Sequence, residues 1–214
     1  MQAILKSSYG LLLFAALISG VELFAWFYLQ QIGYLQMLVD NDQSQVSLLI
    51  IAIYLLATLH FLYACYTTSL HFNDLRKQPQ GAYQSALLKN FFAQARLPAA
   101  SAEASQPLLE VLDMRIRSGY AFGFVVADLM LKLGILGTVI GFIIMLGSLS
   151  NLNSVDITVM QTLLAEMSGG MKVALFTTLA GMLSGILLNI KYNLVDWAVD
   201  HLVNDIRESL IIND

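Results

Sequence analysis

Long apolar stretches alternate with short polar ones along this chain. Four of the apolar stretches approach or exceed the roughly 20 residues that a helix needs to cross a lipid bilayer. They cover residues 9–29, 46–70, 129–149 and 170–190. The pattern therefore predicts an all-α integral membrane protein with four membrane-spanning helices.

Basic residues are concentrated in one connection between the spans. Residues 30–45 and 150–169, which connect the other spans, contain no Lys or Arg. The segment between the second and third spans carries Arg76, Lys77, Lys89, Arg96, Arg115 and Arg117. Because connections rich in Lys and Arg stay in the cytoplasm, we expect this segment and both termini to be cytoplasmic. The first apolar stretch continues past the length of a cleaved signal, which indicates an uncleaved anchor.

The segment between the second and third spans predicts a short cytoplasmic helical hairpin. Apolar residues recur with helical spacing from Tyr83 to Ala95, and a second helix begins near Pro107 and continues into the third span. The segment is too short for an independent catalytic domain. The chain thus divides into an N-terminal membrane hairpin (1–73), the cytoplasmic segment (74–118), a second membrane hairpin (119–193) and a cytoplasmic C-terminal helix (194–214).

Composition excludes several classes of protein. Of the 214 residues, 57% are hydrophobic and 12% are charged, whereas soluble domains carry about 25% charged residues. The net charge of −4 is small and mixed in sign, so nothing indicates the basic face that a nucleic-acid surface needs. A lone Cys65 excludes an internal disulfide and a cysteine-rich metal site. Without a cluster of residues able to perform chemistry, we expect no enzyme, no cofactor and no metal site.

The third and fourth spans each place small residues on one helical face. In LKLGILGTVIGFIIMLG, which begins at Leu131, the positions i, i+3, i+4 and i+7 are Gly134, Gly137, Thr138 and Gly141. The corresponding face of the fourth span consists of Gly170, Ala174, Thr177, Thr178, Gly181, Ser184 and Gly185. Such faces let two helices pack closely, because van der Waals contact replaces the hydrophobic drive that lipid does not provide.

The hydroxyl groups on these faces have two interpretations. They can be packing residues whose hydroxyls bond to the carbonyl one turn back. Thr138 and Thr178, however, both fall roughly 12 to 17 Å below the outer surface, where a polar group tends to mark a pathway. The two spans contain no titratable residue at that depth, so an ion pathway here needs a carboxylate from a partner.

Other polar residues form two candidate pairs. Asp128 and Lys132 are spaced i, i+4 at the cytoplasmic end of the third span, as in a local ion pair. Glu22 in the first span and His60 in the second are rare residue types inside a membrane, and antiparallel packing predicts similar depths for them. We interpret them as a structural hydrogen-bonded pair; the alternative is a second proton relay.

The segments LGILGTVIGF and GMKVALFTTLAGM resemble the paired signature helices of the MotA/TolQ/ExbB proton-channel family, most closely its TolQ and ExbB branch. The resemblance covers residues 131–193 and includes both motifs, Leu-Gly-x-x-Gly-Thr-x-x-Gly and Gly-x-x-x-Ala-Leu-x-x-Thr-x-x-Gly. By this resemblance, Thr138 and Thr178 correspond to two pore threonines of the family. The residues that match the frame of the second motif are Gly170, Ala174, Leu175 and Gly181.

The resemblance implies a ring of five subunits in the bacterial inner membrane, around the single membrane helices of two MotB/TolR/ExbD-like partners. The partner would supply the ion-binding aspartate, and proton flow, or sodium flow, would drive mechanical work. Three features depart from the TolQ and ExbB pattern: four spans instead of three, a shorter cytoplasmic segment, and Lys172 and Val173 where an acidic residue often stands.

Two other classes remain open. A secondary transporter would show internal repeats, and none is visible in the sequence. A scaffold that only oligomerises through its small-residue faces would tolerate Thr138→Val and Thr178→Val. The process that the protein would power is not indicated.

Overall fold

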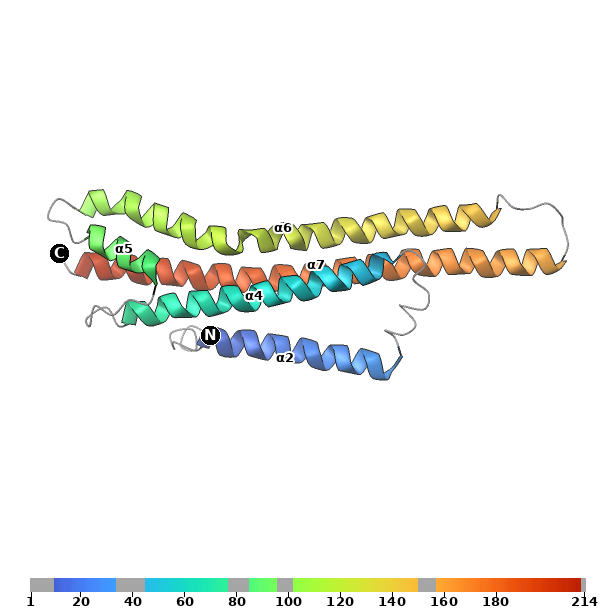
Figure 1. Cartoon of the computed structure of the whole chain (residues 1–214), viewed down its shortest axis with the longest axis horizontal. Coiled ribbons are helices and arrows are strands. Elements are labelled where there is room, and N and C mark those ends of the chain that lie inside the picture. The colour runs from blue at the N-terminus through green and yellow to red at the C-terminus, as the bar shows by residue number, and fades with distance from the viewer. Residues whose placement is uncertain (1–9, 34–44, 77–84, 96–101, 150–156, 213–214) are drawn as a thin grey trace. The chain divides into compact units, whose positions relative to one another are not determined.

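The computed structural model describes residues 10–33, 45–76, 85–95, 102–149 and 157–212, and nearly all of these residues are helical (Figure 1). The helices are α2 (Gly10–Gln31), α4 (Val46–Arg76), α5 (Ala86–Ala95), α6 (Ala102–Leu149) and α7 (Ile157–Ile212). The first residue of the first predicted span, residues 34–44 and 150–156 of two connections, and residues 77–84 and 96–101 of the cytoplasmic segment lie outside the described residues.

Four helices in the described part of the chain are long and apolar enough to cross a membrane, as the sequence predicts. They are α2, α4, α6 and α7. One crossing fits the 22 residues of α2, but α4, α6 and α7 have 31, 48 and 56 residues. Since about 20 residues span the bilayer, these three helices continue past the apolar layer of a multi-pass membrane protein.

Two helix boundaries differ from the expected ones. The fourth span and the C-terminal helix form one helix, α7, which begins at Ile157 and not near Gly170. No proline interrupts this stretch, and each interior glycine costs only about 1 kcal/mol relative to alanine. The helix α6 likewise begins at Ala102, before Pro107, and the proline within its second turn removes one backbone hydrogen bond of a long helix.

The chain divides into two compact units. The first unit contains residues 1–20, 59–123 and 190–214, and the second contains residues 21–58 and 124–189. The long helices α4, α6 and α7 therefore contribute one part to each unit. Each unit has a core of its own.

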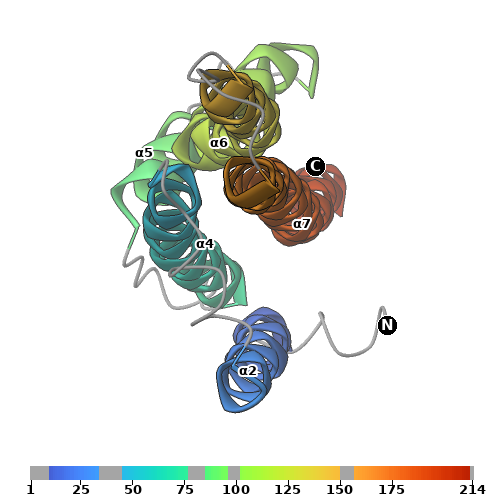
Figure 2. The ribbon, with the colours of Figure 1, turned by 90° about the vertical axis from the view of Figure 1, so that its right-hand side faces the viewer.

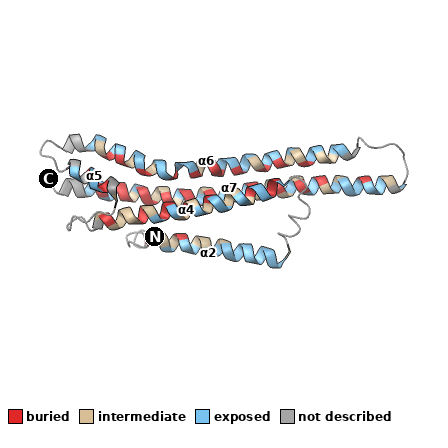
Figure 3. Cartoon of the chain, viewed as in Figure 1, coloured by how far each residue is buried: buried red, intermediate tan, exposed pale blue. Residues whose placement is uncertain are grey.

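The core of the first unit forms where α4, α5, α6 and α7 bury one apolar face each. Along the end of α7, the fully buried residues recur with helical spacing, and Asp200 and Asp205 face away from them. Figure 3 shows this alternation of buried and exposed positions along the helices. Large buried side chains of this core are Phe61, Leu88, Phe91, Leu112, Ile116, Tyr192, Val195, Val199, Leu202 and Ile206.

The second unit contains the hairpin of α6 and α7, together with the end of α2 and the start of α4. The two hairpin helices lie side by side (Figures 1 and 2). Their buried positions include the glycines of the small-residue faces together with Met130, Val173 and Leu188, whereas many other large apolar side chains are exposed, among them Ile135, Phe142, Leu175 and Leu183. From Val21 onward, α2 is exposed except for the half-buried Glu22 (Figure 3). Such outward apolar surfaces suit a lipid environment.

Candidate functional site

The helices α6 and α7 approach each other at glycine. A Cβ atom added to Gly181 would lie 2.6 Å from the carbonyl oxygen of Met130 and 2.7 Å from the Cα of Gly134. Real Cβ atoms essentially never come that close to such atoms. The backbones of the two helices are therefore in direct contact, as small residues permit in membrane helices.

The same close contact continues in both directions along the hairpin. A Cβ on Gly141 would lie 2.7 Å from the amide nitrogen of Ala174, and one on Gly170 would lie 2.9 Å from the carbonyl oxygen of Gly141. At the other end, a Cβ on Gly185 would lie 3.0 Å from the carbonyl oxygen of Ala127. The small-residue faces thus form the contact between α6 and α7.

Thr177 lies inside this contact and is fully buried. Its Oγ1 lies 2.9 Å from the carbonyl oxygen of Val173 and 3.1 Å from that of Ala174, in the preceding turn of α7. A Cβ on Gly137 would lie 2.4 Å from this Oγ1. Within the chain, Thr177 therefore fills the space that Gly137 leaves.

Thr178 is half-buried and links the two helices. Its Oγ1 lies 3.0 Å from the carbonyl oxygen of Ala174 and 3.2 Å from that of Gly134 on α6. A threonine hydroxyl has one proton and two lone pairs. The two carbonyls share that proton, so the oxygen retains acceptor capacity toward water or a hydrated cation.

Thr138 is also half-buried, and its hydroxyl donates to the carbonyl oxygen of Ile135 at 2.5 Å. The hydroxyls of Thr138 and Thr178 thus donate hydrogen bonds to backbone carbonyls. Within this chain, the two hydroxyls are not hydrogen-bonded to each other. Ser184 is half-buried on α7. The three threonine hydroxyls share one chemical property: each O–H donates to a carbonyl, and its oxygen atom can still accept.

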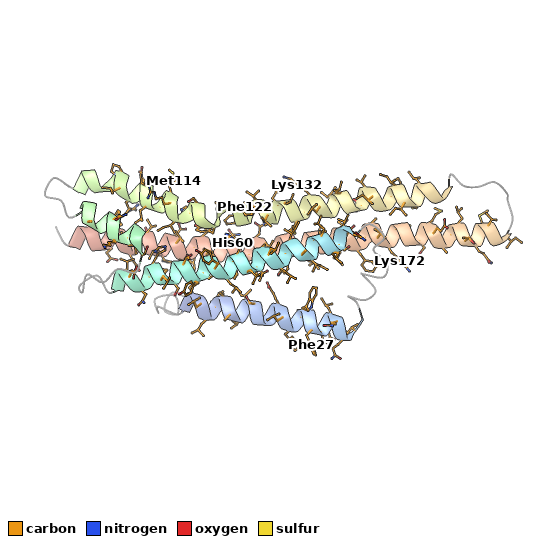
Figure 4. All side chains as sticks on the ribbon, in the orientation of Figure 1. Phe27, His60, Met114, Phe122, Lys132 and Lys172 are labelled. Carbon is orange, nitrogen blue, oxygen red and sulfur yellow. The ribbon has the colours of Figure 1, made fainter. Side chains whose placement is uncertain are left out.

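The charged residues of the hairpin lie away from these hydroxyls along the sequence. Lys132 Nζ is 2.5 Å from Asp128 Oδ2, and both side chains are about two-thirds exposed, at 69% and 63%. Lys172 is exposed on α7 (Figure 4). The sequence has no charged residue in 133–149 or 173–190.

Glu22 and His60 each have a partner other than the expected one. His60 Nδ1 lies 2.9 Å from the hydroxyl oxygen of Tyr192, and the Tyr54 hydroxyl donates a hydrogen bond to the Glu22 carboxyl. His60 belongs to the first unit and Glu22 to the second. A direct Glu22–His60 pair therefore stays a prediction.

An ion cluster that was not predicted from the sequence joins α6 to α7 in the first unit. Arg117 donates to Asp113 at 2.8 Å, to Asp196 at 2.5 Å and also to Asp200. The Tyr120 hydroxyl donates to Asp196 at 2.7 Å. The i, i+4 spacing of Asp113 with Arg117 and of Asp196 with Asp200 is the only sequence signal for this cluster.

The comparison with protein-family models identifies one relationship. The model of the MotA/TolQ/ExbB proton channel family matches residues 84–208, which is more than half of the chain. This range includes α5, all of α6 and nearly all of α7, together with the whole small-residue contact. Comparisons with curated proteins and with solved structures found no significant match.

Proposed function

The chain belongs to the MotA/TolQ/ExbB proton channel family, and we propose that it is an ion-conducting ring subunit of a motor in the bacterial inner membrane. In this proposal, the ring converts a proton gradient into mechanical work through a separate partner protein. The single observation that carries the proposal is the hydroxyl of Thr178, held at the contact of α6 and α7 with its proton committed to carbonyls.

The proposed partner is a dimer of a single-span protein of the MotB/TolR/ExbD type. Cation conduction across a membrane needs a group that binds the ion and releases it. Residues 133–149 and 173–190 contain no carboxylate, so the carboxylate of the pathway comes from this partner. The hairpin contributes the uncharged oxygen atoms around it.

The proposed orientation places both termini in the cytoplasm. It rests on the Lys and Arg residues between the second and third predicted spans and on their absence from the sequence of the other two connections. A pentamer, protons as the transported ion, and a closer relation to the TolQ and ExbB branch are further parts of the proposal. They rest on the signature motifs of α6 and α7.

Proton flux through the assembled complex tests this function. The chain is co-expressed with the single-span protein encoded beside it, and proton uptake into vesicles is followed with a pH-sensitive dye. Thr178→Val keeps the side-chain volume and removes the hydroxyl, so we expect at least a tenfold loss of flux. Thr178→Ser, which keeps the hydroxyl, is the matched control and should conduct. Wild-type flux from the valine variant would contradict the pathway.

Native mass spectrometry tests the proposed assembly. The gently solubilised chain is measured alone and after co-expression with the single-span protein. Five copies that gain two copies of the partner agree with the motor architecture. A monomer or dimer that ignores the partner favours a membrane scaffold, in which the glycine contacts serve packing alone.

A further inference from the structure

Two lysines of the second unit, Lys132 on α6 and Lys172 on α7, lie on the outer sides of the hairpin (both are labelled in Figure 4). Lys132 precedes Gly141 by nine residues, and Lys172 precedes Gly181 by the same number. Nine residues are two and a half helical turns, so each lysine lies on the side of its helix opposite to a glycine of the α6–α7 contact. Both lysine side chains are exposed.

Each lysine shares its outer face with large apolar side chains. The exposed neighbours that follow Lys132 on its face of α6, and those that follow Lys172 on its face of α7, are Ile135, Leu136 and Val139, and Leu175, Leu179 and Leu183, respectively. A face of this composition suits lipid. The two lysines are therefore charged groups on surfaces that otherwise fit the hydrocarbon layer.

The close contact of the two helices shows the level of Lys132 along the hairpin. A Cβ atom on Gly181 would lie 2.6 Å from the carbonyl oxygen of Met130 and 2.7 Å from the Cα of Gly134. Lys132 lies midway between Met130 and Gly134 in the sequence. Lys132 is therefore level with Gly181 on the neighbouring helix.

The same contact shows the level of Lys172. A Cβ atom on Gly141 would lie 2.7 Å from the amide nitrogen of Ala174 and 2.8 Å from the carbonyl oxygen of Gly170. Lys172 lies midway between these two residues in the sequence, so it is level with Gly141. The levels of the two lysines are thus nine residues apart on either helix, which is about 14 Å.

This uncharged belt is much thinner than the hydrocarbon layer of about 30 Å. The uncharged stretches 133–149 and 173–190 are each about 25 Å long, but the register of the two helices shifts them past each other. They overlap only between the two lysine levels. A tilt of the hairpin would shorten the belt further along the membrane normal.

The directions of the helices let both lysines reach out of this belt. Side chains lean toward the N-terminus of their own helix, and α6 and α7 run in opposite directions, so the two lysines lean apart. The Nζ of Lys132 lies 2.5 Å from Oδ2 of Asp128, four residues or about 6 Å nearer the start of α6. With an equal reach for Lys172, the two ammonium groups are about 26 Å apart along the hairpin. This separation is close to the thickness of the hydrocarbon layer.

We propose that Lys132 and Lys172 bind lipid phosphates in opposite leaflets and thereby fix the depth of the hairpin in the bilayer. A lysine stem packs along apolar surface while its ammonium reaches the headgroups, and an ammonium has three donors, enough for a carboxylate and a phosphate together. The midpoint between the two lysine levels falls within about 3 Å of three hydroxyl-bearing residues, namely Thr138, Thr177 and Thr178. The two lysines thus hold these hydroxyls at the centre of the bilayer. The inference goes beyond the proposed function and holds equally for a scaffold.

Tryptophan fluorescence tests the depth of the hairpin. Met171 and Met182 are 55% and 45% exposed on α7 and lie about 8 Å on either side of the midpoint. Met171→Trp and Met182→Trp are made separately in the full chain, in a background of Trp26→Phe and Trp197→Phe. The vesicles contain phosphatidylcholine brominated at known acyl positions, in a buffer free of phosphate. We expect the same bromine position to quench both reporters best, and unequal depths would overturn the proposal.

Removal of one lysine should shift the hairpin toward the leaflet that the other lysine contacts. In Lys172→Leu, the Met171→Trp reporter should become deeper and the Met182→Trp reporter shallower, each by about 5 Å, or one helical turn. Lys132→Leu combined with Asp128→Leu should change the two depths in the opposite directions. Lys172→Arg keeps a long cationic side chain, so it is the matched control and should leave both depths unchanged.

The outcomes separate this inference from the proposed function. Reporter depths that stay the same after loss of either lysine would overturn the proposal and would mean that the lysines face protein or water. The reporters in an otherwise unchanged chain test it without any lysine variant. None of these measurements needs ion flux, so normal conduction by Thr178→Val would remove the proposed function and leave the lipid contacts in place.

Discussion

The ring of Tyr192 occupies the space that a side chain at Gly123 would need, with 2.0 Å between Cζ and the position of a Cβ. The two residues come from α7 and α6 within the first unit. The glycine at position 123 therefore leaves room for an aromatic ring. The glycines of the hairpin have a different role, because they bring two helix backbones into contact.

Gly123→Ala should destabilise the protein. The added methyl group requires Tyr192 to move, and the strain of such overpacking is typically about 1 to 3 kcal/mol. We expect a lower apparent melting temperature in detergent. Gly119→Ala, one turn earlier on α6 with nothing within 4 Å of its Cβ position, is the control and should not lower it. Partial recovery by Tyr192→Leu in the Gly123→Ala background would assign the loss to this contact.

Gly181→Ala should separate α6 from α7. Its methyl group would meet the carbonyl oxygen of Met130 and the Cα of Gly134, and backbone atoms cannot rotate away as side chains do. We expect reduced yield of assembled protein and a lower melting temperature, measured by size-exclusion chromatography and a thermal shift. Gly147→Ala on α6 has open space around its Cβ position and should assemble normally. Equal behaviour of the two variants would contradict the close contact.

Arg117→Met should loosen the ion cluster of the first unit. The change leaves Asp113, Asp196 and Asp200 without the guanidinium that each accepts from. Since these side chains are about one-third to one-half exposed, we expect a modest loss of about 1 kcal/mol. The difference from wild type should shrink at high salt because screening weakens exposed pairs. Arg115→Met, at an exposed neighbouring position, should change the melting temperature little at any salt concentration.

Glu22→Gln should keep ion-driven flux. The Tyr54 hydroxyl donates to the Glu22 carboxyl, and a glutamine carbonyl accepts the same bond without a charge. Glu22→Leu, which leaves the hydroxyl without that acceptor, should lower thermal stability by about 1 to 3 kcal/mol. Loss of flux in the Gln variant, with assembly intact, would show that a proton is exchanged at Glu22.

The membrane spans and the small-residue contact could be predicted because their signals are local. A helix repeats every 3.6 residues, so the spacing of Gly134, Gly137 and Gly141 already indicates one smooth face. The same rule predicts the buried face at the end of α7. Helix ends are less predictable, and α7 begins at Ile157 because glycine alone does not end a helix.

The partners across the first unit could not be predicted from local spacing. His60 and Tyr192 are 132 positions apart, and Arg117 is 79 positions from Asp196. Pairing at such a separation depends on which helices pack together and on their register. Neither the choice of neighbouring helices nor their register follows from composition. A histidine in an apolar stretch also has no preferred partner along its own helix.

The hydroxyls of Thr138, Thr177 and Thr178 all donate to backbone carbonyls, and this arrangement sets the sign of the charge that their oxygen atoms attract. With each proton committed, the atoms that remain are lone pairs, which attract cations and repel anions. The discrimination needs no formal charge, so hydroxyl oxygens alone would hold a cation only weakly. If the chain forms the proposed ring, that ring would leak little until the proposed partner supplies its carboxylate, and a cell could make the two proteins in unequal amounts without dissipating its membrane gradient.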